Sequence, residues 1–225
     1  MKRFYSDVSV ADGAILLDGR PVKTPARATL AIPHPALAAE IAEEWRSQGE
    51  VIDPRAMPLT GLGNAAIDRV APDPAAFAKM LAAYGETDLL CYRADGPPEL
   101  IARQNTAWDP LLDWAQARYD IHFMVTAGIV HVPQPAATVQ RLGEALAARD
   151  IFALAAMAPL ITLGGSLVTA LALSEDAVGA DAAFDLTHLD ELWQAERWGE
   201  DQLAAETRAA RRRDFMAAAR LLTLL

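Results

Sequence analysis

The sequence predicts an α+β protein in which a small N-terminal β-meander or α+β domain precedes a larger, mainly α-helical domain. Two patterns predict this class: short extended runs separated by turns fill residues 3–32, and helical periodicity dominates from residue 59 onward. Charge supports the division, because residues 1–60 carry 7 cations and 8 acids, whereas residues 61–225 carry 13 and 22. We therefore expect an α+β domain over residues 1–60 and a mainly helical domain over residues 61–225.

The N-terminal part begins with extended segments joined by tight turns. Asp12-Gly13 and Asp18-Gly19 separate apolar runs, and Asp-Gly between such runs favours a β-hairpin because glycine accepts a positive φ. Three or four strands are therefore expected within residues 3–32. An amphipathic helix entered through Pro35 and closed by Gly49 follows, and it should cover one face of the sheet.

The rest of the chain has the pattern of consecutive helices separated by proline or glycine. The expected helical segments are 59–70, 74–84, 98–118, 136–148, 151–173 and 181–221. Two short strands, Asp88–Arg93 and His122–Thr126, are expected between them. Residues 151–174 contain no charge, which is also typical of a membrane span, but Pro159 and the many alanines favour a buried helix pair.

The composition of the chain disfavours several classes of protein function. The chain has 225 residues, with 30 acids against 20 Lys and Arg, a net charge of -10 that opposes binding to nucleic acid and favours basic partners. The single cysteine, Cys91, excludes an internal disulfide and indicates a reducing compartment. The start, MKRFYSDVSV, lacks the apolar region of a signal peptide. We expect a cytoplasmic protein, monomeric when free, without membrane insertion.

The acidity is concentrated near the C-terminus. Residues 174–206 contain ten acids and one cation, Arg197. Thr187 and Asp190 have capping-box spacing, so a helix is expected to begin there, with Leu203 available for packing. Its repeated acids fit either a solvated face or a docking surface for a basic partner. The basic run at 211–213 fits a solvated face or a strip that pairs with the acidic helix.

No strong catalytic motif is present. The four histidines lack metal-ligand spacing, Ser166 in LGGSL is not a nucleophile elbow, and Cys91 in DLLCY fits a buried thiol. The best enzyme reading is a small acid-base enzyme in which His188 stands beside Asp190 and Glu191, although acids in a first helical turn also complement the helix dipole. The tryptophans, Trp45 and Trp108 among them, fit helix-locking positions.

Seven motifs taken together nevertheless resemble a known family. They are RFY (3–5), LDGRPVKTP (17–25), EEWRSQ (43–48), MPLTGLGNAAID (57–68), TDLLCYR (87–93), WDPLLDWAQARY (108–119) and DELWQAERWG (190–199). Together they resemble the alpha-subunit assembly chaperones of ATP synthase, the Atp-twelve family of mitochondria and alphaproteobacteria. The resemblance spans nearly the whole chain, and it agrees with the two-part fold derived above.

The resemblance implies a chaperone and not an enzyme, with no cofactor and no metal. Its partner would be the unassembled alpha subunit of the ATP synthase catalytic sector, which it would keep from aggregating until the beta subunit replaces it. The implied partner-binding residues fall in the last motif and just after it: Asp190, Glu191, Gln194, Trp198 and Asp201. Structural roles are expected for Trp45, Trp108 and Gly199. Because the chain shows no transit peptide, the implied location is the bacterial cytoplasm.

Overall fold

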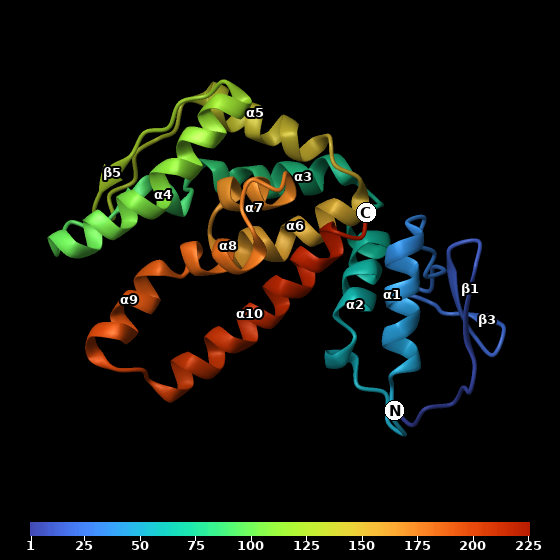
Figure 1. The fold of residues 1–225 in the computed structure, drawn as a ribbon. Coiled ribbons are helices and arrows are strands. Elements are labelled where there is room, and N and C mark those ends of the chain that lie inside the picture. Colours follow the sequence, from blue (N-terminus) through green and yellow to red (C-terminus); the bar gives the residue numbers. More distant parts are fainter.

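The computed structural model describes residues 1–225 and confirms the predicted fold class, a small strand region followed by a mainly helical part (Figure 1). Three antiparallel strands, β1 (Val8–Ala11), β2 (Ala14–Leu17) and β3 (Arg20–Pro21), lie in that order. Both Asp-Gly pairs form the predicted turns. At Gly13, with φ of +77°, a Cβ would stand 2.6 Å from the carbonyl oxygen of Ile32, so glycine is required there.

Helix α1 (Pro35–Arg46) covers the sheet, as predicted, and ends three residues before Gly49. Its buried residues are Leu37, Ala38, Ile41 and Ala42, which share one face. Two arginine side chains join α1 to the N-terminal segment. Arg46 donates to the carbonyl oxygen of Val8, and Arg3 donates to the carbonyl oxygens of Tyr5 and Gln48. The first motif and the EEWRSQ motif are thereby joined by the Arg3 side chain, which donates to a main-chain carbonyl oxygen.

Polar residues of the other N-terminal motifs also hold the layer together. The Glu44 carboxylate accepts from the backbone N–H groups of Leu59 and Thr60, both at 2.7 Å, and so caps α2 (Pro58–Ala65). Burial raises the pKa of Glu44 despite these bonds. Asp68 accepts from the Thr24 hydroxyl at 2.7 Å. Segments distant in sequence are therefore fixed to one another by carboxylates.

The helical part contains more breaks than the periodicity predicted. Its helices after α2 are α3 (Pro74–Ala82), α4 (Pro98–Tyr119), α5 (Ala136–Ala147), α6 (Ile151–Gly164), α7 (Leu167–Ser174), α8 (Ala180–Thr187), α9 (Leu189–Trp198) and α10 (Gln202–Leu222). The expected helix 59–70 is α2 followed by a π-helical turn over Ala66–Val70. The expected helix 181–221 is three helices, broken at His188 and at Gly199, whose φ of +89° no helix accommodates.

The charge-free segment 151–174 forms the buried helix pair α6 and α7. Nine residues of α6 and seven of α7 are buried, and Gly165, with φ of +67°, turns the chain between them. No helix of the structure combines the length and apolarity that crossing a membrane requires. Ser166 is fully buried and caps α7 by accepting from the backbone N–H of Thr169 at 3.0 Å.

The two short strands are shorter than predicted, β4 (Tyr92–Arg93) and β5 (Thr126–Ala127), and they pair in parallel. The residues before β4 form a 3₁₀ turn over Leu89–Cys91 because Asp88 bonds to it. Asp88 is fully buried, and its carboxylate accepts from the backbone N–H groups of Leu90 and Val168, the latter in α7. Burial raises the pKa of Asp88 to about 6. Cys91 is buried, as expected, and burial raises its pKa to about 12.

Two apolar clusters form the core. The larger, of 39 buried residues, runs from Tyr5 in the N-terminal layer to Leu221 in α10, and the smaller, of 11, includes Leu111 of α4, Val168 of α7 and Leu189 of α9. The predicted domain boundary at residue 60 falls inside α2. One continuous apolar cluster has members on both sides of this boundary. The division into two domains stays a prediction.

Candidate functional site

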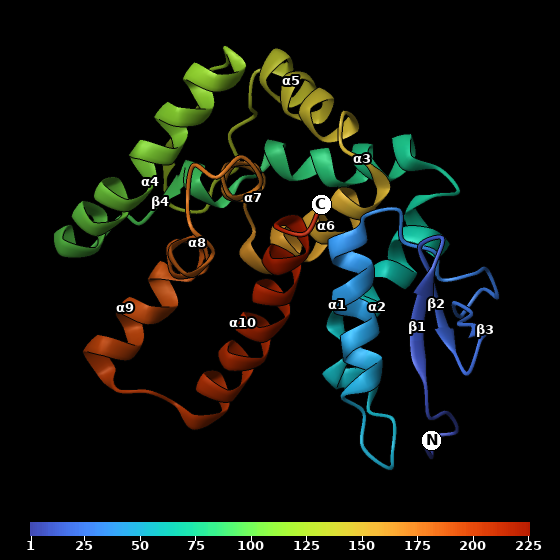
Figure 2. The ribbon, with the colours of Figure 1, turned by 45° about the vertical axis from the view of Figure 1, so that its right-hand side comes forward.

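The acidic C-terminal stretch forms an arm, which we define as residues 189–222. Helix α9 runs outward from the body, residues 199–201 turn the chain, and α10 returns to the body (Figures 1 and 2). All five predicted partner-binding residues lie on α9 or on this turn.

The arm does not begin with the expected capping box. Thr187 is the last residue of α8, and its hydroxyl lies 3.1 Å from the carbonyl oxygen of Ala183 and 2.9 Å from that of Phe184. The N-cap of α9 is His188, without a side-chain cap bond. The capping-box prediction was therefore wrong, because the Thr187 hydroxyl binds back along the preceding helix and not forward to α9.

His188 does not have the environment of an acid-base catalyst. Its ring stacks on Phe184 with centroids 3.9 Å apart, its Nδ1 lies 2.9 Å from the Phe184 carbonyl oxygen, and it is almost fully buried. Burial lowers its pKa, which favours the neutral ring. None of the five main cavities is lined by His188, Asp190 or Glu191. The acid-base interpretation thus gains no supporting geometry.

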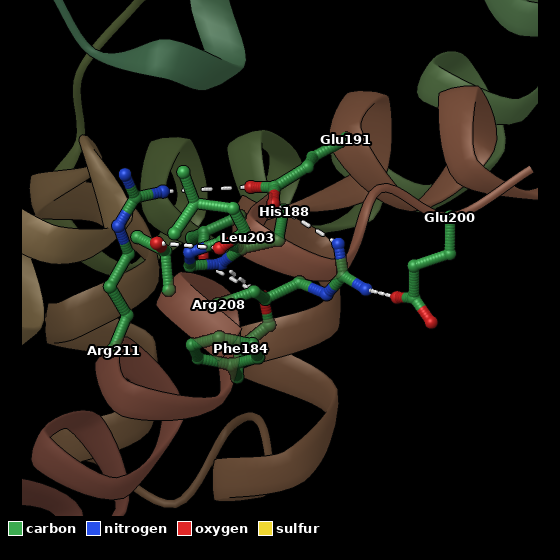
Figure 3. A network of polar contacts seen from close by, with 9 residues as sticks. Phe184, His188, Glu191, Glu200, Leu203, Arg208 and Arg211 are labelled. Carbon is green, nitrogen blue, oxygen red and sulfur yellow. Dashed lines mark hydrogen bonds and ion pairs between the residues drawn. The ribbon is translucent and has the colours of Figure 1, made fainter. Parts of the chain in front are cut away.

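Glu191 bridges the two helices of the arm (Figure 3). Its Oε1 accepts from Arg208 of α10 at 3.0 Å, and its Oε2 lies 3.5 Å from Arg211. Arg208 is also paired with Glu200, and its side chain is only 13% exposed. Because both carboxylate oxygens of Glu191 face arginines of α10, this residue joins α9 to α10.

Asp190 fastens the arm to the body. Its Oδ1 accepts from the Gln104 side-chain amide at 2.8 Å, and the fully buried Gln104 accepts in turn from the backbone N–H of Ala94, also at 2.8 Å. A second tie joins Arg103 to Glu196 at 2.9 Å. Helix α9 is therefore attached to α4 by polar side chains near both of its ends.

The other three predicted residues are exposed. Gln194 and Asp201 lie at the surface, and Trp198 is 72% exposed although its ring meets Trp193 edge-on at 5.4 Å. Asp201 caps α10 by accepting from the backbone N–H of Ala204 at 2.9 Å. Sequence reasoning assigned Leu203 to packing, but it is 72% exposed, so the turn presents two large apolar side chains to solvent.

Most of the acids in residues 174–206 are paired within the chain. Six of them form ion pairs with arginines: Glu175, Asp181, Asp185, Glu191, Glu196 and Glu200. Arg211 and Arg212 of the basic run pair with acids of α8 and α9, as the pairing-strip interpretation expected. The ion pair between Arg208 and Glu191 was not predicted, because nothing in the sequence shows that two residues 17 positions apart face each other across a turn.

The tryptophans given structural roles lie at element junctions. Trp108 is fully buried, and its indole N–H donates to the carbonyl oxygen of Leu186 at 2.9 Å. Trp45 packs edge-on against Tyr5 at 5.8 Å. Gly199 has φ of +89° and ψ of 158°, a conformation that is essentially restricted to glycine. No group of three His, Cys, Asp or Glu side chains is arranged to hold a metal ion.

Known proteins share this architecture. The family model of the ATP12 chaperone protein matches residues 2–116. The crystal structure of Atp12 from Paracoccus denitrificans is 43% identical with a TM-score of 0.93, over 99% of this chain and 97% of that one. The structure of the Atu1473 protein from Agrobacterium tumefaciens is 43% identical with a TM-score of 0.94, over 99% of this chain and 85% of that one.

A more distant relative is the mitochondrial protein atp12 of Schizosaccharomyces pombe, which is 25% identical over 214 residues, 88% of this chain and 74% of that protein. The family model covers half of the chain, and the solved relatives extend the likeness through the arm. The chain therefore belongs to the ATP12 chaperone family, the ATP synthase assembly chaperones that its motifs resemble.

Proposed function

We propose that this protein is an assembly chaperone that binds the unassembled alpha subunit of the ATP synthase catalytic sector, prevents its aggregation and hands it to the beta subunit. The observation that carries the proposal is the exposed pair Trp198 and Leu203 at the turn of the arm. Large apolar side chains gathered on a surface are typical of protein interaction sites. A subunit awaiting assembly presents the complementary surface, because permanent interfaces are large and apolar.

The five residues of the site divide into two roles. Trp198, Gln194 and Asp201 are exposed and would touch the partner, with Trp198 as the apolar anchor. Asp190 and Glu191 would act as positioning residues, because their carboxylates are bonded to Gln104 and to Arg208 within the chain. The positioning matters because an anchor contributes most to binding when its scaffold is already ordered.

Charge would contribute mainly to the rate of encounter. The helical part carries a net charge of -9, and an acidic surface accelerates and orients the approach of a basic partner in a salt-dependent way. The small apolar contact at the turn would limit affinity. Such a contact can be displaced by the larger interface that the beta subunit offers, so release requires no ATP hydrolysis by the chaperone.

A variant pair tests the role of the turn. Trp198→Ser should weaken alpha-subunit binding by about tenfold or more, the usual loss for a truncated aromatic anchor. Met80→Ser is the matched control, because Met80 is a single apolar residue, 55% exposed on α3, away from the arm. Binding would be measured by titration of purified wild type and variants. Equal losses for the two variants would contradict a docking role for the turn. We expect the free protein to be a monomer in the bacterial cytoplasm.

A further inference from the structure

Three of the N-terminal motifs meet at a cavity that the arm does not involve. The cavity has a volume of about 320 Å³ and lies where α1, α2 and the segment after β3 come together. Its lining includes Val22 and Lys23 from LDGRPVKTP, Trp45 from EEWRSQ, and Met57, Gly61 and Asn64 from MPLTGLGNAAID. We call this cavity the N-terminal slot.

The folding roles of these motifs do not account for the slot. Glu44, Gln48 and Asp68 of the same motifs all bond to main-chain groups of other segments, so they hold the fold. Trp45 and Asn64 line the slot, and the Trp45 Nε1 and Asn64 Oδ1 atoms are buried with no hydrogen-bond partner. Buried polar atoms without partners are rare and costly in a folded protein. One is a donor and the other an acceptor, which is the complement of a peptide group.

A second cavity extends the slot. Its volume is about 550 Å³, and it shares Val22, Lys23 and Trp45 with the slot. Its lining also includes Met1 and Phe4, which are 74% and 64% exposed. Two adjoining cavities on either side of Trp45 suit an extended chain, whose successive side chains need separate pockets.

The two cavities are lined by two cations, Arg20 and Lys23, and one acid, although the protein as a whole is acidic. Residues 19–39 contain three cations and no acid. Lys23 lines both cavities, and its ammonium group donates to the Thr29 hydroxyl at 2.9 Å and not to a carboxylate. Asp18 is the one acid lining either cavity, and its carboxylate is occupied by the backbone N–H groups of Ser6 and Asp7. Charge complementarity therefore favours an acidic occupant.

We propose that the N-terminal slot binds an extended segment of the client protein, in which an apolar side chain enters the slot beside an Asp or Glu that faces Lys23. A peptide group of that segment would satisfy Trp45 Nε1 and Asn64 Oδ1. The inference rests on the proposed function in one respect, since the segment is taken to belong to the alpha subunit. The N-terminal sheet and the turn of the arm lie apart from each other (Figure 2), so two weak contacts would hold one client more tightly than either alone.

Gly61 allows the slot to be blocked with a matched control. It lies in α2 and lines the slot, and a Cβ added there would meet nothing within 4 Å. Gly61→Phe should therefore be accommodated and narrow the slot from the α2 side, whereas Gly61→Ala adds only a methyl group and favours the helix. A second variant, Asn64→Leu, replaces the unpaired acceptor with an apolar group of similar size, which a folded protein tolerates.

The first readout is binding of the intact alpha subunit. We expect Gly61→Phe and Asn64→Leu to bind about tenfold more weakly than wild type, and Gly61→Ala to bind like wild type. If the alpha subunit binds wild type and Gly61→Phe equally, the slot is not a client site and the proposed function stands. If wild type itself binds no alpha subunit, the proposed function fails, and the client assignment of the slot fails with it.

The second readout identifies the segment. Overlapping peptides covering the alpha subunit would be added to isotope-labelled protein, and the indole N–H resonance of Trp45, assigned with Trp45→Phe, would be followed. Peptides with an apolar residue beside Asp or Glu should shift this resonance in wild type and in Gly61→Ala but not in Gly61→Phe. A shift produced only by basic peptides, or by none, would overturn the proposal.

Discussion

Reversal of the charge at Glu191 should destabilise the arm itself, and any loss of partner binding should be a consequence of that. In Glu191→Lys, an ammonium group would replace the carboxylate that lies 3.0 Å from Arg208 and 3.5 Å from Arg211. Two unit charges about 4 Å apart interact by about 4 kcal/mol at an effective dielectric constant of 20. Glu191 is 32% exposed, so solvent screening reduces each pair to about 1 kcal/mol.

The total effect follows from these pairs. The substitution removes two attractions and introduces repulsion of similar size, so it should destabilise the arm by about 2 to 4 kcal/mol. If the arm unfolds with the rest of the chain, the melting temperature should fall by roughly 4 to 16 °C for a protein of this size. Backbone amide exchange in α9 should accelerate in either case. Loss of partner binding would then follow from a displaced Trp198.

Glu206→Lys is the matched control, because it makes the same change of charge on the exposed face of α10, where Glu206 contacts only Gln202. Thermal unfolding and hydrogen exchange would be compared for both variants. If Glu191→Lys and Glu206→Lys gave the same melting temperature and the same exchange in α9, the bridging role assigned to Glu191 would be refuted.

Three further changes test the fold. Trp45→Arg should cost about 1 to 3 kcal/mol in urea unfolding, because it removes the half-buried indole that packs edge-on against Tyr5; a wild-type unfolding midpoint would contradict that packing. The pKa of buried Asp88 is about 6 when folded, against an ordinary value of 3.8, so the folded state binds more protons between these values, and stability should fall by about 3 kcal/mol as pH rises from about 3 to about 7. The same titration with Asp88→Asn should lack this fall, and equal pH slopes would refute the raised pKa. Gly199→Ala should cost about 1 to 3 kcal/mol through strain at positive φ, seen as faster amide exchange at the turn; unchanged exchange would show that the turn tolerates a side chain.

Local signals predicted the elements that local chemistry determines. The two Asp-Gly pairs were enough to predict the hairpins of the sheet, because a tight turn depends on the backbone conformation of its two central residues. The absence of charge over residues 151–174, interrupted by Pro159, was enough to predict α6 and α7 as buried helices. Four of the five predicted partner-binding residues come from the DELWQAERWG motif, which lies on α9 and the turn, and their binding role stays a prediction.

Contacts between distant segments could not be predicted in this way. The partners of Glu191 and Asp190 are Arg208 and Gln104, and nothing local indicates that these side chains meet. The exposure of Leu203 was missed because an apolar residue beside a helix start normally packs, and here the turn at Gly199 directs it to solvent. The N-terminal slot was missed for the same reason, since its lining comes from three motifs that only the fold brings together.

We propose that this chain recognises one subunit of the ATP synthase catalytic sector before assembly. The most direct test is to express the tagged protein separately with the alpha subunit and with the beta subunit of its own organism, and to ask which subunit stays in solution and elutes with it. We expect the alpha subunit alone to be recovered with the chaperone. Recovery of neither subunit, or of the beta subunit in its place, would contradict it.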